Sequence, residues 1–152
     1  TYYWQFEFLI EIGGEVSSSD LNKDNSELEE WVVGIQHPYT NTVLTKVKLN
    51  NYSMATSGTY NNFFEKDGIE YSHILNPKSG YPIENNIVST TVIARECIDA
   101  DALATMLMLM DLKEGIEIIN SIDNTECLIV TKNSNKDLTL HYSYNFLDFI
   151  MD

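Results

Sequence analysis

Residues 88–110 read VSTTVIARECIDADALATMLMLM, and this stretch decides the fold. Its first part is rich in β-branched side chains, which predict a strand over residues 88–94. Alanine, leucine and methionine dominate the second part, and they predict a helix from Asp99 to about Met110. A strand that leads within a few residues into a helix indicates a domain built from both kinds of element.

Short apolar runs on either side of this stretch predict further strands. They are rich in β-branched and aromatic residues, and several alternate with polar residues. The predicted strands cover residues 6–12, 31–36, 43–49, 52–56, 69–75, 127–131 and 138–142, and a second helix covers residues 113–122. Short connections favour antiparallel pairing. We therefore predict an α+β fold: a mostly antiparallel sheet with two helices late in the chain, forming a single domain over residues 1–152.

The segments between the predicted strands carry turn-forming residues. Gly13-Gly14 ends the first strand, and residues 17–27 form a polar stretch with nothing to bury, which predicts a surface loop. Ser57-Gly58 predicts a tight turn after the strand that precedes it. A rigid loop is predicted at Asn76–Pro82, because this segment contains two prolines and a glycine.

The chain is strongly acidic, with a formal net charge of −14 at pH 7. This charge argues against binding to nucleic acid or to anionic membranes, because both attract basic surfaces. An anionic ligand would need a bound cation, a lysine or a helix N-terminus. Arg95 is the only arginine, so a bidentate arginine clamp on phosphate is not expected. No apolar run has the length of a membrane span, and no signal peptide opens the chain.

The two cysteines give little information about the redox environment. Cys97 precedes the first predicted helix, and Cys127 starts a predicted strand. A disulfide between them and a pair of free thiols are both compatible with these positions. Since free cysteines are among the most often buried residues, we expect two free thiols.

Asp101 and Thr105 lie four residues apart in the predicted helix, so their side chains share one face. A carboxylate and a hydroxyl are hard oxygen donors, which suit Mg²⁺ with positions left open for substrate phosphates. The same residues also suit an ordinary helix start, with Asp99 as N-cap, Asp101 favoured by the helix dipole and Thr105 bonded to a carbonyl. The spacing alone leaves both interpretations open.

Three other positions combine residue types that can contact a ligand. His73 lies in a strand that leads into the predicted rigid loop, where it fits either a structural hydrogen bond or proton transfer. Ser57 and Gly58 could cradle phosphate or ribose oxygens, or form an ordinary turn. Gly13-Gly14 permits a close approach of the backbone to a ligand.

Taken in order, these positions form five motifs. They are Gly13-Gly14-Glu15, Trp31-x-Val33-Gly34-Ile35-x-x-Pro38, Thr56-Ser57-Gly58-x-Tyr60, His73-Ile74-x-Asn76-Pro77-x-Ser79-Gly80-x-Pro82 and Ala100-Asp101-Ala102-Leu103-Ala104-Thr105. From about Leu9 to the C-terminus, the chain resembles the ApbE family of Mg²⁺-dependent FAD:protein FMN transferases, formerly described as thiamine-biosynthesis lipoproteins. Asn76 stands where Asp is common in the family, a change that should preserve the turn.

The resemblance implies a fold related to the T-fold and a role for each motif. It implies that Asp101 and Thr105 bind Mg²⁺, which in turn binds the FAD pyrophosphate, and that His73 is catalytic. The residues implied to contact the FAD are Gly13, Gly14, Thr56, Ser57, Gly58, His73 and Ile74.

The resemblance also implies a reaction. A threonine or serine hydroxyl of an acceptor flavoprotein attacks the FMN-side phosphorus of FAD, and AMP leaves. Two alternatives remain: an Mg²⁺-dependent FAD pyrophosphatase that uses water to give FMN and AMP, and a non-catalytic FAD-binding module. Family members also carry, before the Gly-Gly strand, a segment with a Lys-Gly motif and further FAD and metal contacts, which this chain lacks. Many members are bacterial lipoproteins, so we expect a parent protein anchored to the membrane and facing the periplasm or outer surface.

Overall fold

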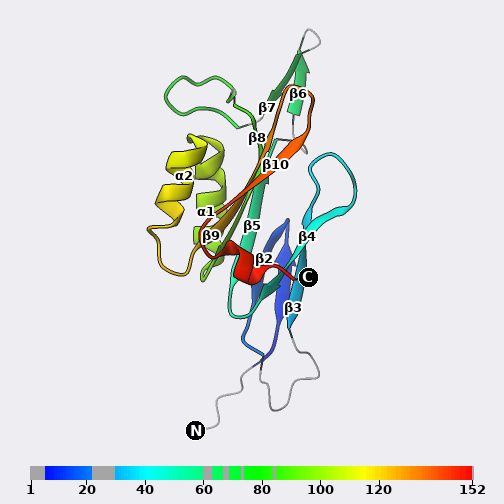
Figure 1. The fold of residues 1–152 in the computed structure, drawn as a ribbon, viewed down its shortest axis with the longest axis vertical. Coiled ribbons are helices and arrows are strands. Elements are labelled where there is room, and N and C mark those ends of the chain that lie inside the picture. Colours follow the sequence, from blue (N-terminus) through cyan, green and yellow to red (C-terminus); the bar gives the residue numbers. More distant parts are fainter. Residues whose placement is uncertain are drawn as a thin grey trace.

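A six-stranded antiparallel sheet forms the centre of the molecule (Figure 1). The computed structural model describes residues 6–21, 30–59, 63–66, 69–72, 74–83 and 85–151. The strand order is β1-β2-β5-β8-β9-β10. The bounds of these strands are β1 Leu9–Ile12, β2 Glu15–Ser18, β5 Ser53–Gly58, β8 Ile87–Ala94, β9 Glu126–Lys132 and β10 Leu138–Tyr142.

Other elements cover the two faces of this sheet and give the molecule three layers. Helices α1 (Cys97–Met108) and α2 (Leu112–Ile119) lie on one face, and the hairpin of β3 (Trp31–Gln36) and β4 (Val43–Leu49) lies on the other (Figure 1). The short 3₁₀-helix η1 (Phe146–Phe149) packs on the hairpin side through the buried Phe146. A separate pair, β6 (Phe63–Lys66) and β7 (Ile69–Ser72), is also antiparallel.

Strand β8 separates two hydrophobic cores, and all eight of its residues are buried. Val92 and Ala94 belong to the core under the helices, whereas Val88 and Ile93 belong to the core under the β3–β4 hairpin. A strand covered on both faces needs no polar alternation. This explains why residues 88–94 carry the strongest strand signal in the sequence.

The structure confirms the predicted α+β class and several of its elements. Strands β3 and β4 have the predicted bounds and pair with each other, and β9 pairs with β10 as a hairpin. Cys97 and Cys127 are both free thiols, as expected. Among the described residues, no helix is long and apolar enough to cross a membrane.

Strand β2 and the residues after it correct the predicted surface loop at 17–27. Ser18, Ser19 and Leu21 are buried, while residues 22–27 lie outside the described part of the chain. Backbone partners make this burial possible, because Ser18 Oγ donates to the Tyr52 carbonyl at 2.9 Å and Ser19 Oγ accepts from the Phe8 N–H at 2.9 Å. The prediction from polar composition was therefore wrong: the serine hydroxyls are buried because they bond to backbone groups, in addition to the backbone hydrogen bonds at the same positions.

Two further predictions needed correction along the middle of the chain. The predicted strand 69–75 ends at Ser72, and Leu75 instead forms an isolated bridge with Pro82. Strand β6 was not predicted at all. Asp67-Gly68, a sequence typical of a turn before this strand, lies outside the described residues.

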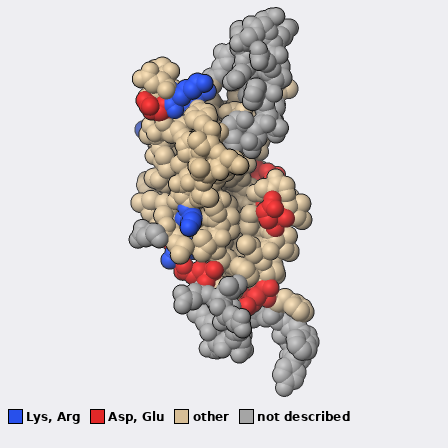
Figure 2. Space-filling view, turned by 90° about the vertical axis from the view of Figure 1, so that its right-hand side faces the viewer, with Lys and Arg blue, Asp and Glu red and all other residues tan. Residues whose placement is uncertain are grey.

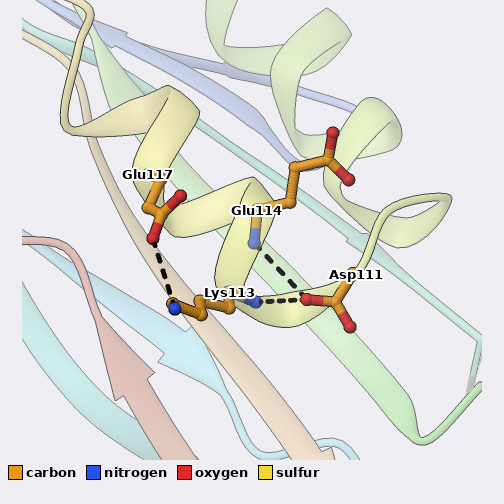
Figure 3. A network of polar contacts seen from close by, with 4 residues as sticks. All are labelled: Asp111, Lys113, Glu114 and Glu117. Carbon is orange, nitrogen blue, oxygen red and sulfur yellow. Dashed lines mark hydrogen bonds and ion pairs between the residues drawn. The ribbon is translucent and has the colours of Figure 1, made fainter.

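Helix α2 illustrates how local polar contacts fix an element. Asp111 is its N-cap, and Asp111 Oδ1 accepts from the backbone N–H groups of Lys113 at 3.0 Å and Glu114 at 3.4 Å (Figure 3). Lys113 and Glu117 form an ion pair at 3.8 Å one turn apart. The cap satisfies two N–H groups that a helix start leaves without partners.

Figure 2 shows one face of the molecule, on which the Lys and Arg side chains of the described residues are few and separated.

The end of the chain returns to the β3–β4 hairpin. Ile150 forms an isolated antiparallel bridge with Val47, and the Met151 N–H donates to the Lys46 carbonyl at 2.9 Å. Val47 is fully buried. Ile150 and Met151 thus pair with the edge of strand β4.

Candidate functional site

Helix α1 lies against β5 and β8 and presents its predicted metal ligands to solvent. Ala100 and Ala104 are fully buried against the sheet, because their small side chains allow a close approach. Asp101 and Thr105 each follow one of these alanines, and both are exposed. The helix therefore carries one buried stripe of alanines beside one exposed pair of oxygen donors.

The start of α1 differs from the prediction. Glu96 is the N-cap, with φ −103° and ψ 136°, and its side chain makes no capping hydrogen bond. In the interpretation of residues 99–105 as an ordinary helix start, Asp99 is the N-cap, but the structure has it in the first turn of the helix. The prediction failed because Cys97 and Ile98 already have helical conformation, so the helix begins two residues earlier.

Ser57 connects strand β5 to the predicted metal ligands. Its Oγ lies 3.0 Å from Thr105 Oγ1, within hydrogen-bond distance. Ser57 and Gly58 were predicted as a turn, which is wrong: both belong to β5, where they pair with Thr90 and Ser89 of β8. Pairing with β8 extends the strand through Gly58, a residue that usually weakens strand signals.

Thr56 lies on the opposite face of the sheet from Ser57. Its Oγ1 lies 2.8 Å from Thr91 Oγ1, the neighbouring hydroxyl on β8. This face contributes to a cavity of about 280 Å³ between the sheet and β3. The residues that line it are Glu11, Gly13, Gly14, Val16, Val33, Gly34, Ile35, Gln36, Met54 and Thr56.

The Gly13-Gly14 turn joins β1 to β2 at the mouth of this cavity. Its φ angles are +69° and +107°, a region that side chains disfavour and glycine adopts readily. The Gly14 N–H donates to Glu11 Oε1 at 2.7 Å. The predicted FAD-contacting residues thus divide into two groups: Gly13, Gly14 and Thr56 line the cavity, whereas Ser57 faces helix α1.

Negative charge gathers where β2 passes the start of α1. Burial raises the pKa of the Cys97 thiol, and the negative charges of Glu15 and Asp101 raise it further. Glu15 immediately follows the Gly13-Gly14 turn. Two carboxylates that act on one thiol create a negative potential, which favours a bound cation.

The oxygen donors on α1 fit a hard cation such as Mg²⁺. Asp101 supplies a carboxylate and Thr105 a hydroxyl, and Mg²⁺ commonly takes one or two carboxylates with water and phosphate oxygens. Within the described residues, no three His, Cys, Asp or Glu side chains gather as a metal-binding group. Asp101 and Thr105 would supply two ligands of such a site, and water and phosphate oxygens commonly supply the others.

The predicted rigid loop is held by its own hydrogen bonds. Asn76 Oδ1 accepts from the Lys78 N–H at 2.9 Å, the Gly80 N–H donates to the Asn76 carbonyl at 2.7 Å, and the Ile83 N–H donates to the Ile74 carbonyl at 3.1 Å. Ile74 packs against the core under the helices. His73 lies outside the described residues, so its catalytic role stays a prediction.

A second cavity, of about 560 Å³, lies between this loop and the end of α1. Its lining includes Tyr81 from the loop and Asp111 from the start of α2. Sequence motifs gave no sign of this cavity, because its lining comes from segments that no single motif spans. The β3 residues of the first cavity were found only as part of the Trp31–Pro38 motif, with no role attached.

Comparison with known proteins places this geometry in a family. A family model described as "ApbE family" matches residues 5–129. The chain is 41% identical over 113 residues to an FAD:protein FMN transferase of Vibrio cholerae serotype O1, an alignment that covers 73% of this chain and 33% of that protein.

Solved structures share the fold. The crystal structure of the ApbE protein from Thermotoga maritima matches with a TM-score of 0.81 at 29% identity, covering 96% of this chain and 45% of that one. The flavin transferase ApbE from Vibrio cholerae matches with a TM-score of 0.73 at 33% identity, covering 93% of this chain and 43% of that one. The chain thus spans between a third and a half of the length of these relatives. The matched family model, the sequence identity and the shared fold together show that this chain belongs to the ApbE family.

Proposed function

We propose that this chain forms part of an enzyme that transfers FMN from FAD to a threonine or serine hydroxyl of an acceptor flavoprotein, with Mg²⁺ bound and AMP released. The relatives named as FAD:protein FMN transferases support this proposal. The observation that carries it is the exposed pair Asp101 and Thr105 on α1, with Ser57 Oγ 3.0 Å from Thr105 Oγ1.

In this proposal, the exposed face of α1 receives the pyrophosphate of FAD. Asp101 and Thr105 hold Mg²⁺, which supplies positive charge against the phosphate oxygens. This cation also answers the difficulty that a chain with a net charge of −14 has in binding a dianion. Glu15 and Asp101 both act on the Cys97 thiol, so Glu15 adds negative charge near the start of α1.

The chemical step exchanges one P–O bond for another. The acceptor hydroxyl oxygen forms a bond to the FMN-side phosphorus, and the bond from that phosphorus to the bridging oxygen of AMP breaks. The hydroxyl proton must leave, and His73 is proposed to take it because an imidazole titrates near neutral pH. Gly13, Gly14, Thr56, Ser57, Gly58 and Ile74 are proposed to position the FAD.

The proposal includes the rest of the longer protein. The chain covers 33% of its Vibrio cholerae relative, and its described residues hold no complete carboxylate or histidine ligand group. We therefore propose that a preceding segment completes the metal site and the FAD pocket. The acceptor would be a redox flavoprotein, and the parent protein a periplasmic or outer-surface lipoprotein.

A direct test follows two products at once. The chain is incubated with FAD, Mg²⁺ and an acceptor domain that carries a threonine, and the acceptor is analysed by mass spectrometry while AMP is quantified. A mass gain of one FMN with AMP release, both lost on chelation, supports the transferase. AMP without acceptor labelling supports the pyrophosphatase. FAD binding without either product supports a binding module or a requirement for the preceding segment, and repeating the assay with that segment added separates these two.

A further inference from the structure

Thr90 holds helix α1 to the sheet directly beside the proposed metal ligands. Its Oγ1 donates to the Ala104 carbonyl at 2.6 Å, and the residue is fully buried. Ala104 immediately precedes Thr105. The α-helical pattern already gives this carbonyl a partner, the N–H of Met108, so the Thr90 bond is an additional one. A backbone atom of α1 is thereby fixed to strand β8 at this turn.

Ser57 holds the same turn from the neighbouring strand. Ser57 and Thr90 are directly paired residues of β5 and β8, so their side chains lie side by side on one face of the sheet. Ser57 Oγ reaches Thr105 Oγ1, and Thr90 Oγ1 reaches the Ala104 carbonyl. Two adjacent hydroxyls on two adjacent strands therefore contact two consecutive residues of the helix.

The two contacts restrain different parts of the proposed ligands: one restrains the helix backbone and the other a side-chain rotamer. The Thr90 bond fixes the backbone of α1, and with it Asp101, which lies one turn earlier on the same rigid helix. The Ser57 bond fixes the rotamer of Thr105. A hydroxyl has one hydrogen and two lone pairs, so a Thr105 hydrogen donated to Ser57 leaves its lone pairs for a metal ion. Partners that orient the ligands of a metal commonly matter almost as much as the ligands themselves.

We infer that Thr90 and Ser57 are positioning residues for the magnesium site, and that Thr90 acts through the helix backbone without touching the metal. This inference rests on the proposed function, in which Asp101 and Thr105 bind Mg²⁺. It adds a buried residue that none of the five motifs contains. It also explains why a fully buried polar side chain lies in the otherwise apolar contact between β8 and α1.

The test measures metal binding without relying on turnover. Mn²⁺ is titrated at saturating FAD into the full chain together with the preceding segment that the proposed function requires. Free Mn²⁺ is followed by electron paramagnetic resonance against a blank of FAD alone, and Mg²⁺ then competes. Thr90→Val removes the hydroxyl at nearly constant shape, and Ser57→Ala removes the second contact. Thr90→Ser keeps an oxygen at the same position. Thr131→Val is the matched control, because Thr131 is a buried strand threonine whose Oγ1 lies 2.9 Å from His141 Nε2 on β10 and not from a residue of α1.

Thr90→Val and Ser57→Ala should each weaken Mn²⁺ binding by roughly tenfold, the lower end of the usual effect of orienting residues. Thr90→Ser should bind nearly as the wild type does, and so should Thr131→Val. Thermal unfolding without metal separates a lost fold from a misplaced ligand. If Thr90→Val does not fold, Ser57→Ala and Thr90→Ser decide the question, because both change side chains conservatively.

The possible results separate this inference from the proposed function. If the wild-type chain binds no Mn²⁺ above the FAD blank even with the preceding segment present, both are overturned. Wild-type binding with equal binding by Thr90→Val and Ser57→Ala overturns the positioning role and leaves the magnesium site standing. An equal loss in Thr131→Val also overturns it, since the effect would then be a general loss of sheet stability.

Discussion

Thr56 and Ser57 are consecutive residues of β5, yet their hydroxyls lie on opposite faces of the sheet. Thr56 Oγ1 lies 2.8 Å from Thr91 Oγ1 on the hairpin side, and Ser57 Oγ lies 3.0 Å from Thr105 Oγ1 on the helix side. Alternation along a strand makes this division unavoidable. One short motif therefore serves two surfaces, a cavity beside β3 and the exposed face of α1.

Asp101→Ala should reduce Mg²⁺-dependent AMP release by roughly a hundredfold or more, because a lost carboxylate ligand removes charge stabilisation worth several kcal/mol. The fold should persist, since Asp101 is exposed. The measurement is AMP release over a range of Mg²⁺ concentrations, together with a thermal melt. Asp99→Ala, an exposed change in the first turn of the same helix, is the control. Unchanged turnover in Asp101→Ala would contradict the metal assignment.

His73→Ala should lower the rate more than it lowers the affinity for FAD. Removal of a general base typically costs roughly 10²- to 10⁴-fold in rate, whereas a base contributes little to ground-state binding. Single-turnover kinetics give the rate, and flavin fluorescence gives the Kd for FAD. His37→Ala, in the turn after β3, serves as control. A loss confined to the Kd would make His73 a binding residue.

Glu126→Ala should lower the free energy of unfolding by about 1–3 kcal/mol, because it leaves the buried Ser143 hydroxyl without its acceptor and removes two further hydrogen bonds from Asn145. The Glu126 carboxylate accepts a short hydrogen bond from Ser143 Oγ, and it also accepts from the backbone N–H of Asn145 at 3.1 Å and from Asn145 Nδ2 at 2.9 Å. Urea unfolding measures the change. Glu114→Ala, an exposed carboxylate on α2, should change stability far less. Equal effects of the two variants would show that the buried network contributes nothing specific.

Cys127 should resist alkylation in the folded chain at mildly alkaline pH. Burial, with a smaller contribution from Glu126, raises the pKa of its thiol to about 12 from an ordinary value of 9.0, so the reactive thiolate is scarce. Cys97 is less buried and should react first, though its pKa is raised too. Iodoacetamide labelling followed by mass spectrometry of each peptide, with and without urea, checks both rates. Equal rates for folded and unfolded Cys127 would refute the shift.

The raised pKa of the Cys127 thiol also makes the stability of the folded chain depend on pH. A thiol whose pKa rises on folding stabilises the folded chain fully below the pKa of the unfolded state. This contribution is lost as pH rises from about 9 through about 12. Cys127→Ala should therefore show a flatter decline in stability over that alkaline range than the wild type, as measured by urea unfolding at several pH values.

The sequence predicts those strands whose pattern is local, and it does not predict those that depend on distant partners. Residues 88–94 are β-branched and buried on both faces, so the strand could be predicted without knowing its neighbours. The polar strand β2 could not, because the buried hydroxyl of its Ser18 bonds to the backbone of Tyr52, which lies 34 residues away in the sequence. Long-range pairing of this kind leaves no periodic apolar pattern.

The residues of the candidate site also differ in whether a local sequence pattern predicts their position. Asp101 and Thr105 could be paired from their spacing, since a helix fixes which residues share a face. Gly58 and Ser57 could not be assigned to β5 by that reasoning, because their pairing with Ser89 and Thr90 is what extends the strand. Thr90 gave no signal, since a threonine within a β-branched run is an ordinary strand residue.

The bridge between Ile150 and Val47 has a consequence for how the chain is made. The β3–β4 hairpin is synthesised early, whereas the segment that covers its edge follows the last strand of the sheet. Until then the hairpin keeps an open edge with unpaired backbone groups, which is a site for mispairing between chains. Ribosome-bound chains, and variants shortened to end before Ile150, should therefore need chaperones more than chains that contain residues 146–151.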